Sequence, residues 1–129
     1  MISRIEAMFA RLATEKRSAF IPFIMAGDPN LEASQALLNA LPAAGADMVE
    51  LGMPFSDPMA DGPVIQAAGL RALAAGTTVR NTLALARNFR AAHPDVPLIL
   101  MGYYNPIYRF GPEAFAKEAA EHGVDGLIV

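Results

Sequence analysis

Three carboxylates, Glu50, Asp57 and Asp61, stand close together in the segment ELGMPFSDPMADGP, residues 50–63. The segment begins as an apolar strand and turns at once into a loop that contains several prolines. Because prolines limit the conformational freedom of a loop, the acids would be held in few geometries. Carboxylates held in this way are suited to general acid–base catalysis or to stabilising a developing positive charge.

Glu50 is the strongest catalytic candidate, because of its position in the expected strand. Side chains alternate along a strand, so Val49 and Leu51 share one face and Met48 and Glu50 share the other. In a barrel the two branched residues would face the helices, and Glu50 would point inward near the carboxyl end of the strand, where barrel active sites lie. A buried carboxylate is costly, so it forms an ion pair, takes up a proton or takes part in chemistry.

The two aspartates have simpler alternatives. Asp-Pro and Asp-Gly are common turn sequences, and a turn-forming role is favoured for Asp57. Asp61 could cap the helix expected from Pro63 and face a ligand as well.

No other motif suggests chemistry. The chain lacks a glycine-rich phosphate loop and a nucleophile elbow, and it contains no cysteine. His93 and His122 each lie near the end of an expected helix, where a structural role is favoured, so no metal site is predicted. Tyr103 and its neighbouring tyrosines follow the third expected strand, where packing and ligand contact are both open.

The composition narrows the classes of partner. The chain has 129 residues, a net charge of −3 and no run of basic residues, which argues against nucleic acid and acidic membranes as partners. Neither a stretch of about 18 apolar residues nor the apolar core of a signal peptide is present, so a cytoplasmic location is expected.

Strands and helices are expected to alternate. An amphipathic helix is expected near the amino terminus, and Asp28 with Pro29 is expected to begin a helix that reaches about Ala44, with Leu37 among its buried residues. Strands are expected near residues 20–25, 48–52, 98–101 and 126–129, and further helices over 63–75, 78–93 and 112–121. This alternation predicts a parallel sheet, and both a (β/α) barrel and a doubly wound sheet fit it.

The sequence also contains an internal echo, and it stops within a strand. GADMVEL and GVDGLIV share the order glycine, small residue, aspartate, apolar strand. Because a (β/α)₈ barrel needs about 250 residues, residues 1–129 are interpreted as one domain: the first half, with about four β/α units and an amino-terminal helix.

At ELGMPFSDPMADGPVIQAA the sequence resembles the tryptophan synthase α chain family. FIPFIMAGDP, AGADMVELG, LRALAAGTT, YYNPI and GVDGLIV fit the same family, so the resemblance covers essentially the whole chain. It implies a (β/α)₈ TIM barrel and a lyase step of tryptophan biosynthesis, in which indole-3-glycerol phosphate is cleaved to indole and glyceraldehyde 3-phosphate. It also implies an α₂β₂ tetramer with a β chain that uses pyridoxal phosphate, while the α chain needs no cofactor.

By the same resemblance, Glu50 is the catalytic acid/base and Asp61 holds the indole N–H. Residues expected to form the substrate pocket are Phe23, Met101, Tyr103 and Ile128. Residues expected to contact the β chain are Pro54, Asp57, Asn105 and Pro106. The family's phosphate site lies in later loops, so the chain alone is expected to be inactive. Another phosphate-binding barrel enzyme and a non-catalytic module that docks a partner remain alternatives.

Overall fold

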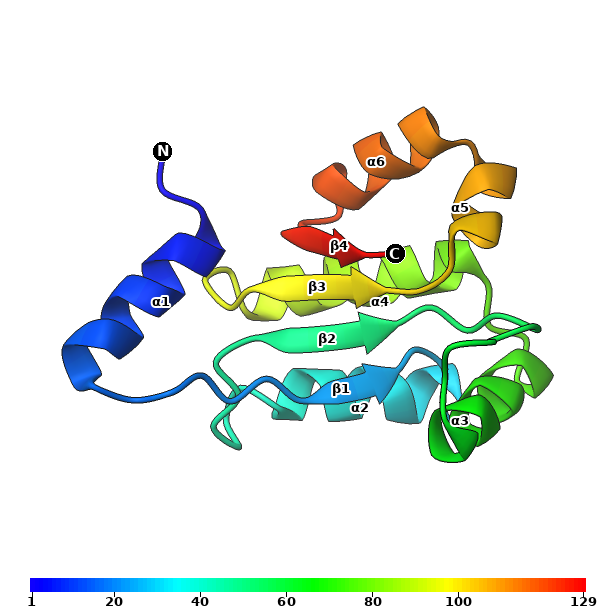
Figure 1. Cartoon of the computed structure of the whole chain (residues 1–129), viewed down its shortest axis with the longest axis horizontal. Helices are drawn as coiled ribbons and strands as arrows, with labels where there is room; N and C mark the ends of the chain where they lie inside the picture. The colour runs from blue at the N-terminus through cyan, green and yellow to red at the C-terminus, as the bar shows by residue number, and fades with distance from the viewer.

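Four short apolar runs form one parallel sheet in the computed structural model, which describes residues 1–129 (Figure 1). The strands are β1 (Phe23–Met25), β2 (Val49–Gly52), β3 (Leu98–Met101) and β4 (Gly126–Ile128), and they lie in the order β1-β2-β3-β4. Each strand pairs in parallel with the next one along the chain. The parallel alternation predicted from the sequence is confirmed.

Six helices connect or precede these strands. They are α1 (Arg4–Glu15), α2 (Leu31–Ala40), α3 (Pro63–Ala74), α4 (Val79–Ala92), α5 (Tyr104–Phe110) and α6 (Pro112–Glu121). Capping boxes start two of them: the Ser3 hydroxyl accepts from the Glu6 amide at α1, and the Thr78 hydroxyl accepts from the Asn81 amide at α4. Pro63 and Pro112 occupy first-turn positions, where their missing N–H costs nothing.

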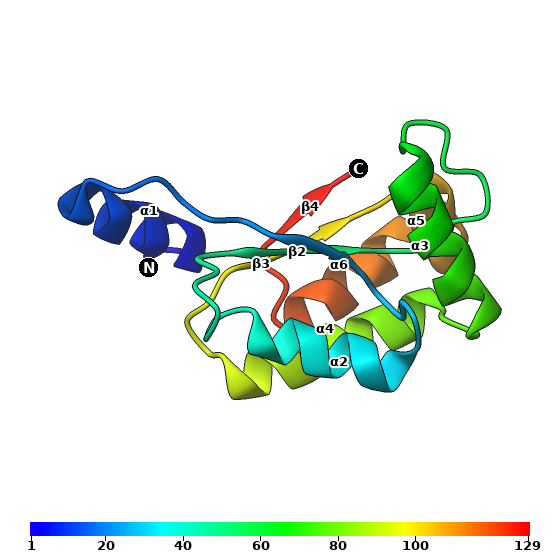
Figure 2. The same cartoon turned by 90° about the horizontal axis from the view of Figure 1, so that it is seen from below.

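The helices α2, α4 and α6 lie on one face of the sheet (Figure 2). Val49, Leu51 and Leu100 point to this face and are fully buried. They belong to one apolar cluster that also includes residues of the helices, namely Leu38, Phe89 and Phe115. A doubly wound sheet carries its connecting helices on both faces, whereas here the strands lie in sequential order and α2, α4 and α6 all lie on one face. The chain is therefore half of a (β/α)₈ barrel wall, which decides between the two folds left open by the sequence.

The opposite face of the sheet would be the barrel interior. Phe23, Glu50 and Ile99 lie opposite one another in the register of the first three strands. At the amino ends of the strands, α1 covers this face through Met8 and Leu12, which cluster with Met48 and Ile99. The carboxyl ends are left for the loops and for α3.

Three details of the expected elements are wrong. Asn30 rather than Asp28 caps α2, because its side chain accepts from the Ala33 amide, while Asp28 forms a bidentate ion pair with Arg71. The helix α2 ends at Ala40 rather than near residue 44. Leu37 is 51% exposed, since its neighbour Leu38 occupies the buried side of the helix.

The repeated sequence pattern of GADMVEL and GVDGLIV corresponds to a repeated contact at the amino ends of the strands. The Asp47 amide donates to the Phe20 carbonyl, and its carboxylate accepts from the Phe20 amide at 2.9 Å. Asp125 forms the same pair with Leu98, also at 2.9 Å. Each carboxylate also binds two arginines: Arg11 and Arg17 for Asp47, Arg4 and Arg90 for Asp125. These buried aspartates are structural and lie away from the loops that follow the strands.

Candidate active site

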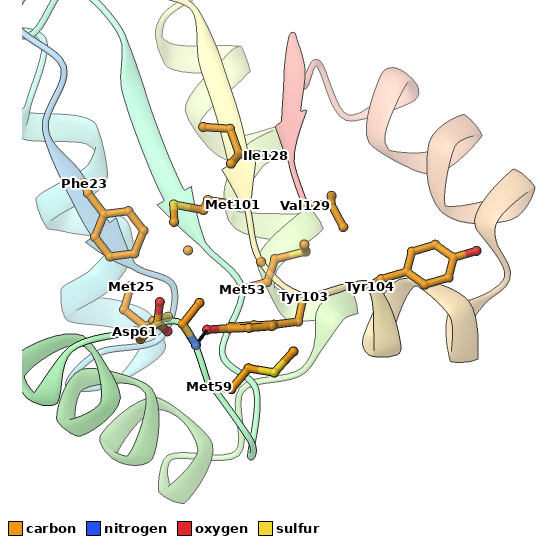
Figure 3. Close-up of a pocket in the computed structure, with 13 residues that line it drawn as sticks. Phe23, Met25, Met53, Met59, Asp61, Met101, Tyr103, Tyr104, Ile128 and Val129 are labelled. Carbon is orange, nitrogen blue, oxygen red and sulfur yellow. Dashed lines mark hydrogen bonds between the residues drawn. The ribbon is translucent and has the colours of Figure 1, made fainter.

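A cavity of about 370 Å³ lies at the carboxyl ends of the strands, between the β2–α3 loop and the segment that follows β3 (Figure 3). Its volume lies within the range of small-molecule pockets. Ten of the thirteen residues that line it are hydrophobic. The thirteen are Phe23, Met25, Gly52, Met53, Met59, Ala60, Asp61, Met101, Gly102, Tyr103, Tyr104, Ile128 and Val129. The expected pocket residues Phe23, Met101, Tyr103 and Ile128 are thus brought together from three strands and a loop.

Gly52 at the end of β2 keeps the floor of the cavity open. A Cβ at this position would lie 2.5 Å from Cζ of Phe23 and 3.0 Å from Sδ of Met25. Any other residue would therefore displace the aromatic ring, so the absence of a side chain at Gly52 gives Phe23 its place on the cavity wall.

Methionine dominates the lining, with Met25, Met53, Met59 and Met101 all on the wall. Methionine side chains are unbranched and polarizable, and they make favourable contacts with aromatic rings. The lining therefore suits a flat aromatic ligand. Met25 was not among the pocket residues expected from the sequence, although strand alternation places it on the same face as Phe23.

Asp61 is the one charged residue on the cavity wall. It is half-buried, and it does not cap α3, because Gly62 is the N-cap and the helix start receives no side-chain hydrogen bond. Its main chain is held instead: the amide donates to the Pro58 carbonyl, and its carbonyl accepts from Nε2 of Gln66 at 2.9 Å. The carboxylate is therefore left available to a ligand, and the capping alternative is excluded.

Glu50 lies deeper than the cavity lining. It is half-buried on β2 and stands two residues before Gly52 on the same face of the sheet, about 6–7 Å further toward the amino end. None of the ion pairs in the structure involves Glu50, so the alternative of a paired structural glutamate is not supported. A ligand that fills the cavity and extends toward the barrel interior would meet Asp61 on the wall and Glu50 below it.

Tyr103 joins the cavity to the β2–α3 loop. Its phenol oxygen accepts a hydrogen bond of 2.9 Å from the Ala60 amide (Figure 3). Its ring lies 5.5 Å from the ring of Phe55, centroid to centroid. Tyr104 also lines the cavity but makes no such hydrogen bond.

The residues expected to contact a partner differ in exposure. Asp57 and Asn105 are exposed and Pro106 is half-buried, whereas Pro54 is buried at the start of the loop. Asp57 accepts from the hydroxyl of Ser56 at 2.6 Å. Beside it, Met59 is 91% exposed, which leaves a large apolar side chain at the tip of the loop.

The remaining candidates are structural. His93 follows α4 and contacts the Asn39 carbonyl, and His122 follows α6 and contacts the Glu118 carbonyl. No group of three or more histidine or acidic residues is placed to hold a metal ion. None of the helices has the length and apolar character needed to cross a membrane.

The fold and the cavity together define a class of protein: a (β/α) barrel with a mainly apolar cavity and carboxylates near the carboxyl ends of its strands. The family model described as "Tryptophan synthase alpha chain" matches residues 9–129. The chain therefore belongs to the tryptophan synthase α chain family.

Solved structures agree with this assignment. Tryptophan synthase subunit alpha of Legionella pneumophila str. Paris is 44% identical, with a TM-score of 0.97, and the match covers 100% of this chain and 49% of that one. A structure from Aquifex aeolicus VF5 is 41% identical (TM-score 0.96), and the match covers 99% of this chain and 51% of that one. The aminoacrylate-bound form of tryptophan synthase from M. tuberculosis is 38% identical (TM-score 0.92), with 98% and 51% covered. The chain thus spans about half the length of these relatives.

Proposed function

We propose that this chain supplies the indole-binding half of an enzyme that cleaves indole-3-glycerol phosphate to indole and glyceraldehyde 3-phosphate. The observation that carries the proposal is a single carboxylate, that of Asp61, on the wall of a methionine-rich cavity, with Glu50 below it on the same sheet. A flat apolar ring with one N–H donor is the ligand that such a wall would accept.

The two carboxylates would have different roles in this reaction. Glu50 would donate a proton to the indole carbon that carries the glycerol chain, while Asp61 accepts the indole N–H and stabilises the positive charge that develops on the ring. Removal of the proton from the adjacent side-chain hydroxyl then forms the aldehyde. The carbon–carbon bond breaks, its electron pair restores the aromatic ring, and Glu50 recovers a proton.

The phosphate group would be held outside residues 1–129, since the family's phosphate-binding loops lie later in the barrel. We further propose a β chain as partner, docked on the β2–α3 loop and on the start of α5. Exposed Met59, Asp57 and Asn105 support this surface. The pyridoxal phosphate would belong to that partner, the α chain would need no cofactor, and the pair would work in the cytoplasm.

The test is Glu50→Gln in the native protein, assayed for indole release from indole-3-glycerol phosphate with the β chain present. We expect a loss of at least about 100-fold, the lower range for general acid–base catalysis, with the circular dichroism spectrum unchanged. Glu113→Gln, at an exposed position of α6, is the matched control. Turnover retained in the Glu50 variant would remove this residue from the mechanism. Absence of indole release from the unsubstituted protein would favour a non-catalytic docking module.

A further inference from the structure

The β2–α3 loop that carries Asp61 is held on two sides. On one side, Nε2 of Gln66 from α3 donates to the Asp61 carbonyl at 2.9 Å. On the other side, the phenol oxygen of Tyr103 accepts from the Ala60 amide at 2.9 Å. Ala60 directly precedes Asp61, so these two bonds hold the main chain on both sides of the peptide that leads into the carboxylate-bearing residue.

Tyr103 contacts both ends of this loop. Its ring lies 5.5 Å from that of Phe55, near the start of the loop, and its oxygen binds Ala60, near the end. The residues between them include Ser56, Asp57 and Met59, which are exposed. A single side chain therefore brackets the exposed part of the loop.

Tyr103 directly follows residues that are hydrogen-bonded to neighbouring strands of the sheet. The amide of the preceding Gly102 donates to the Ile128 carbonyl at 2.9 Å, and the Met101 carbonyl accepts from Met53 at 2.8 Å. These hydrogen bonds continue the β3–β4 and β2–β3 pairing beyond the strand ends. Tyr103 thus follows directly on hydrogen-bonded strand ends and links the sheet to the β2–α3 loop.

We propose that Tyr103 is a positioning residue, whose phenol oxygen holds the Ala60 amide and thereby keeps the Asp61 carboxylate on the cavity wall. This inference rests on the proposed function, in which Asp61 accepts the indole N–H. It differs from a simple lining role, because the ring of Tyr103 can line the cavity without its oxygen. The oxygen matters for the loop.

Tyr103→Phe separates the two roles, since it keeps the ring and removes the acceptor. Ala60 is exposed, so water replaces the lost partner, and a net hydrogen bond of this kind is worth about two- to tenfold in an equilibrium constant. We expect the Ala60 amide to exchange its hydrogen faster by about that factor in NMR measurements. We expect kcat for indole formation to fall by a similar factor with little change in KM, because Asp61 acts mainly on charge that develops in the transition state.

Two controls sharpen the test. Tyr108→Phe removes the hydroxyl of an exposed tyrosine that does not line the cavity, and it should leave exchange and turnover unchanged. In an Asp61→Asn background, the residual rate of indole formation is measured with and without Tyr103→Phe. There the additional Tyr103→Phe change should lower the rate no further, because its effect acts through the carboxylate.

The outcomes distinguish this inference from the proposed function. If the unsubstituted protein releases indole and Tyr103→Phe changes neither Ala60 exchange nor kcat, the positioning role is refuted. A rise in KM with unaltered Ala60 exchange would also overturn it, in favour of direct substrate contact. If Ala60 exchange responds as expected while the unsubstituted protein releases no indole, the tether exists and the proposed function fails.

Discussion

Asp47 offers the sharpest test of how this half barrel is held together. Its side chain is buried and accepts four hydrogen bonds: one from Nη2 of Arg11 at 3.0 Å, two from Arg17 at 2.8 Å each, and one from the Phe20 amide at 2.9 Å. Asp47→Asn keeps the shape but removes the charge, and it turns an amide NH₂ toward a guanidinium. The variant therefore tests the charge and the second acceptor oxygen of Asp47 together, without changing the size of the side chain.

The expected loss of stability follows from how deeply Asp47 and its arginine partners are buried. Breaking a fully buried ion pair costs about 3–5 kcal/mol, whereas an exposed pair is worth no more than about 1 kcal/mol. Here the Asp47 side chain is 5% exposed, but those of Arg17 and Arg11 are 45% and 48% exposed, so water screens the arginine side. We expect Asp47→Asn to lower the free energy of unfolding by about 2–3 kcal/mol at neutral pH.

The loss should depend on pH in a defined direction. The Arg17 guanidinium, followed by the Phe20 amide, holds the pKa of Asp47 well below its usual range. The unfolded chain, with an aspartate pKa of about 3.9, therefore binds the proton first as pH falls. The stability contributed by Asp47 is complete well above that value and is lost as pH drops toward the folded pKa, so the gap between the two proteins should narrow below about pH 4.

The assay is urea unfolding of the purified protein and of the variant at several pH values. Asp95→Asn, at an exposed position, is the control and should change the free energy of unfolding by less than about 0.5 kcal/mol. This account of Asp47 would be refuted if Asp47→Asn changed the free energy of unfolding by less than about 0.5 kcal/mol. It would also be refuted if the difference in unfolding free energy between protein and variant stayed constant down to about pH 3.

Four further predictions concern stability and self-association. Gly52→Ala places a methyl group 2.5 Å from Cζ of Phe23, so unfolding free energy should fall by about 1–3 kcal/mol in urea titrations and indole affinity should fall in fluorescence titrations. Gly27→Ala should cost more than about 2 kcal/mol in the same urea assay, because φ is +83° and the new Cβ would overlap the Thr77 side chain. Asp125→Ala leaves a largely buried arginine without its carboxylate and should cost about 3–5 kcal/mol, measured in the same way. Residues 1–129 alone should self-associate in sedimentation, because the interior face and both sheet edges are unpaired; a sharp monomeric peak with a cooperative melt would contradict this.

The alternating apolar runs were sufficient to predict a parallel sheet, because strands and helices bury side chains at different periods. The same periodicity placed Glu50 on one face of the strand and Val49 and Leu51 on the other. The structure confirms that these two apolar residues face the helices. The family was also recognisable, because the segment around Asp61 combines closely spaced carboxylates and prolines in an unusual local sequence. The cap of α2 was less predictable, because Asp28 and Asn30 are both residue types that cap helices well. Only the tertiary structure shows that Asp28 binds Arg71, which leaves Asn30 as the cap.

The sequence by itself determined the order of the main elements and the family, and it singled out Glu50 and Asp61 as candidates, because these depend on residue type and local spacing. The tertiary structure decided that α2, α4 and α6 lie on one face, that Gly52 leaves room for Phe23, and that Asp61 is free of the helix cap. It also decided that the oxygen of Tyr103 meets the amide of Ala60, 43 residues away in the chain. Contacts of this kind have no local signature, because they depend on how parallel strands bring their carboxyl ends to one edge of the sheet.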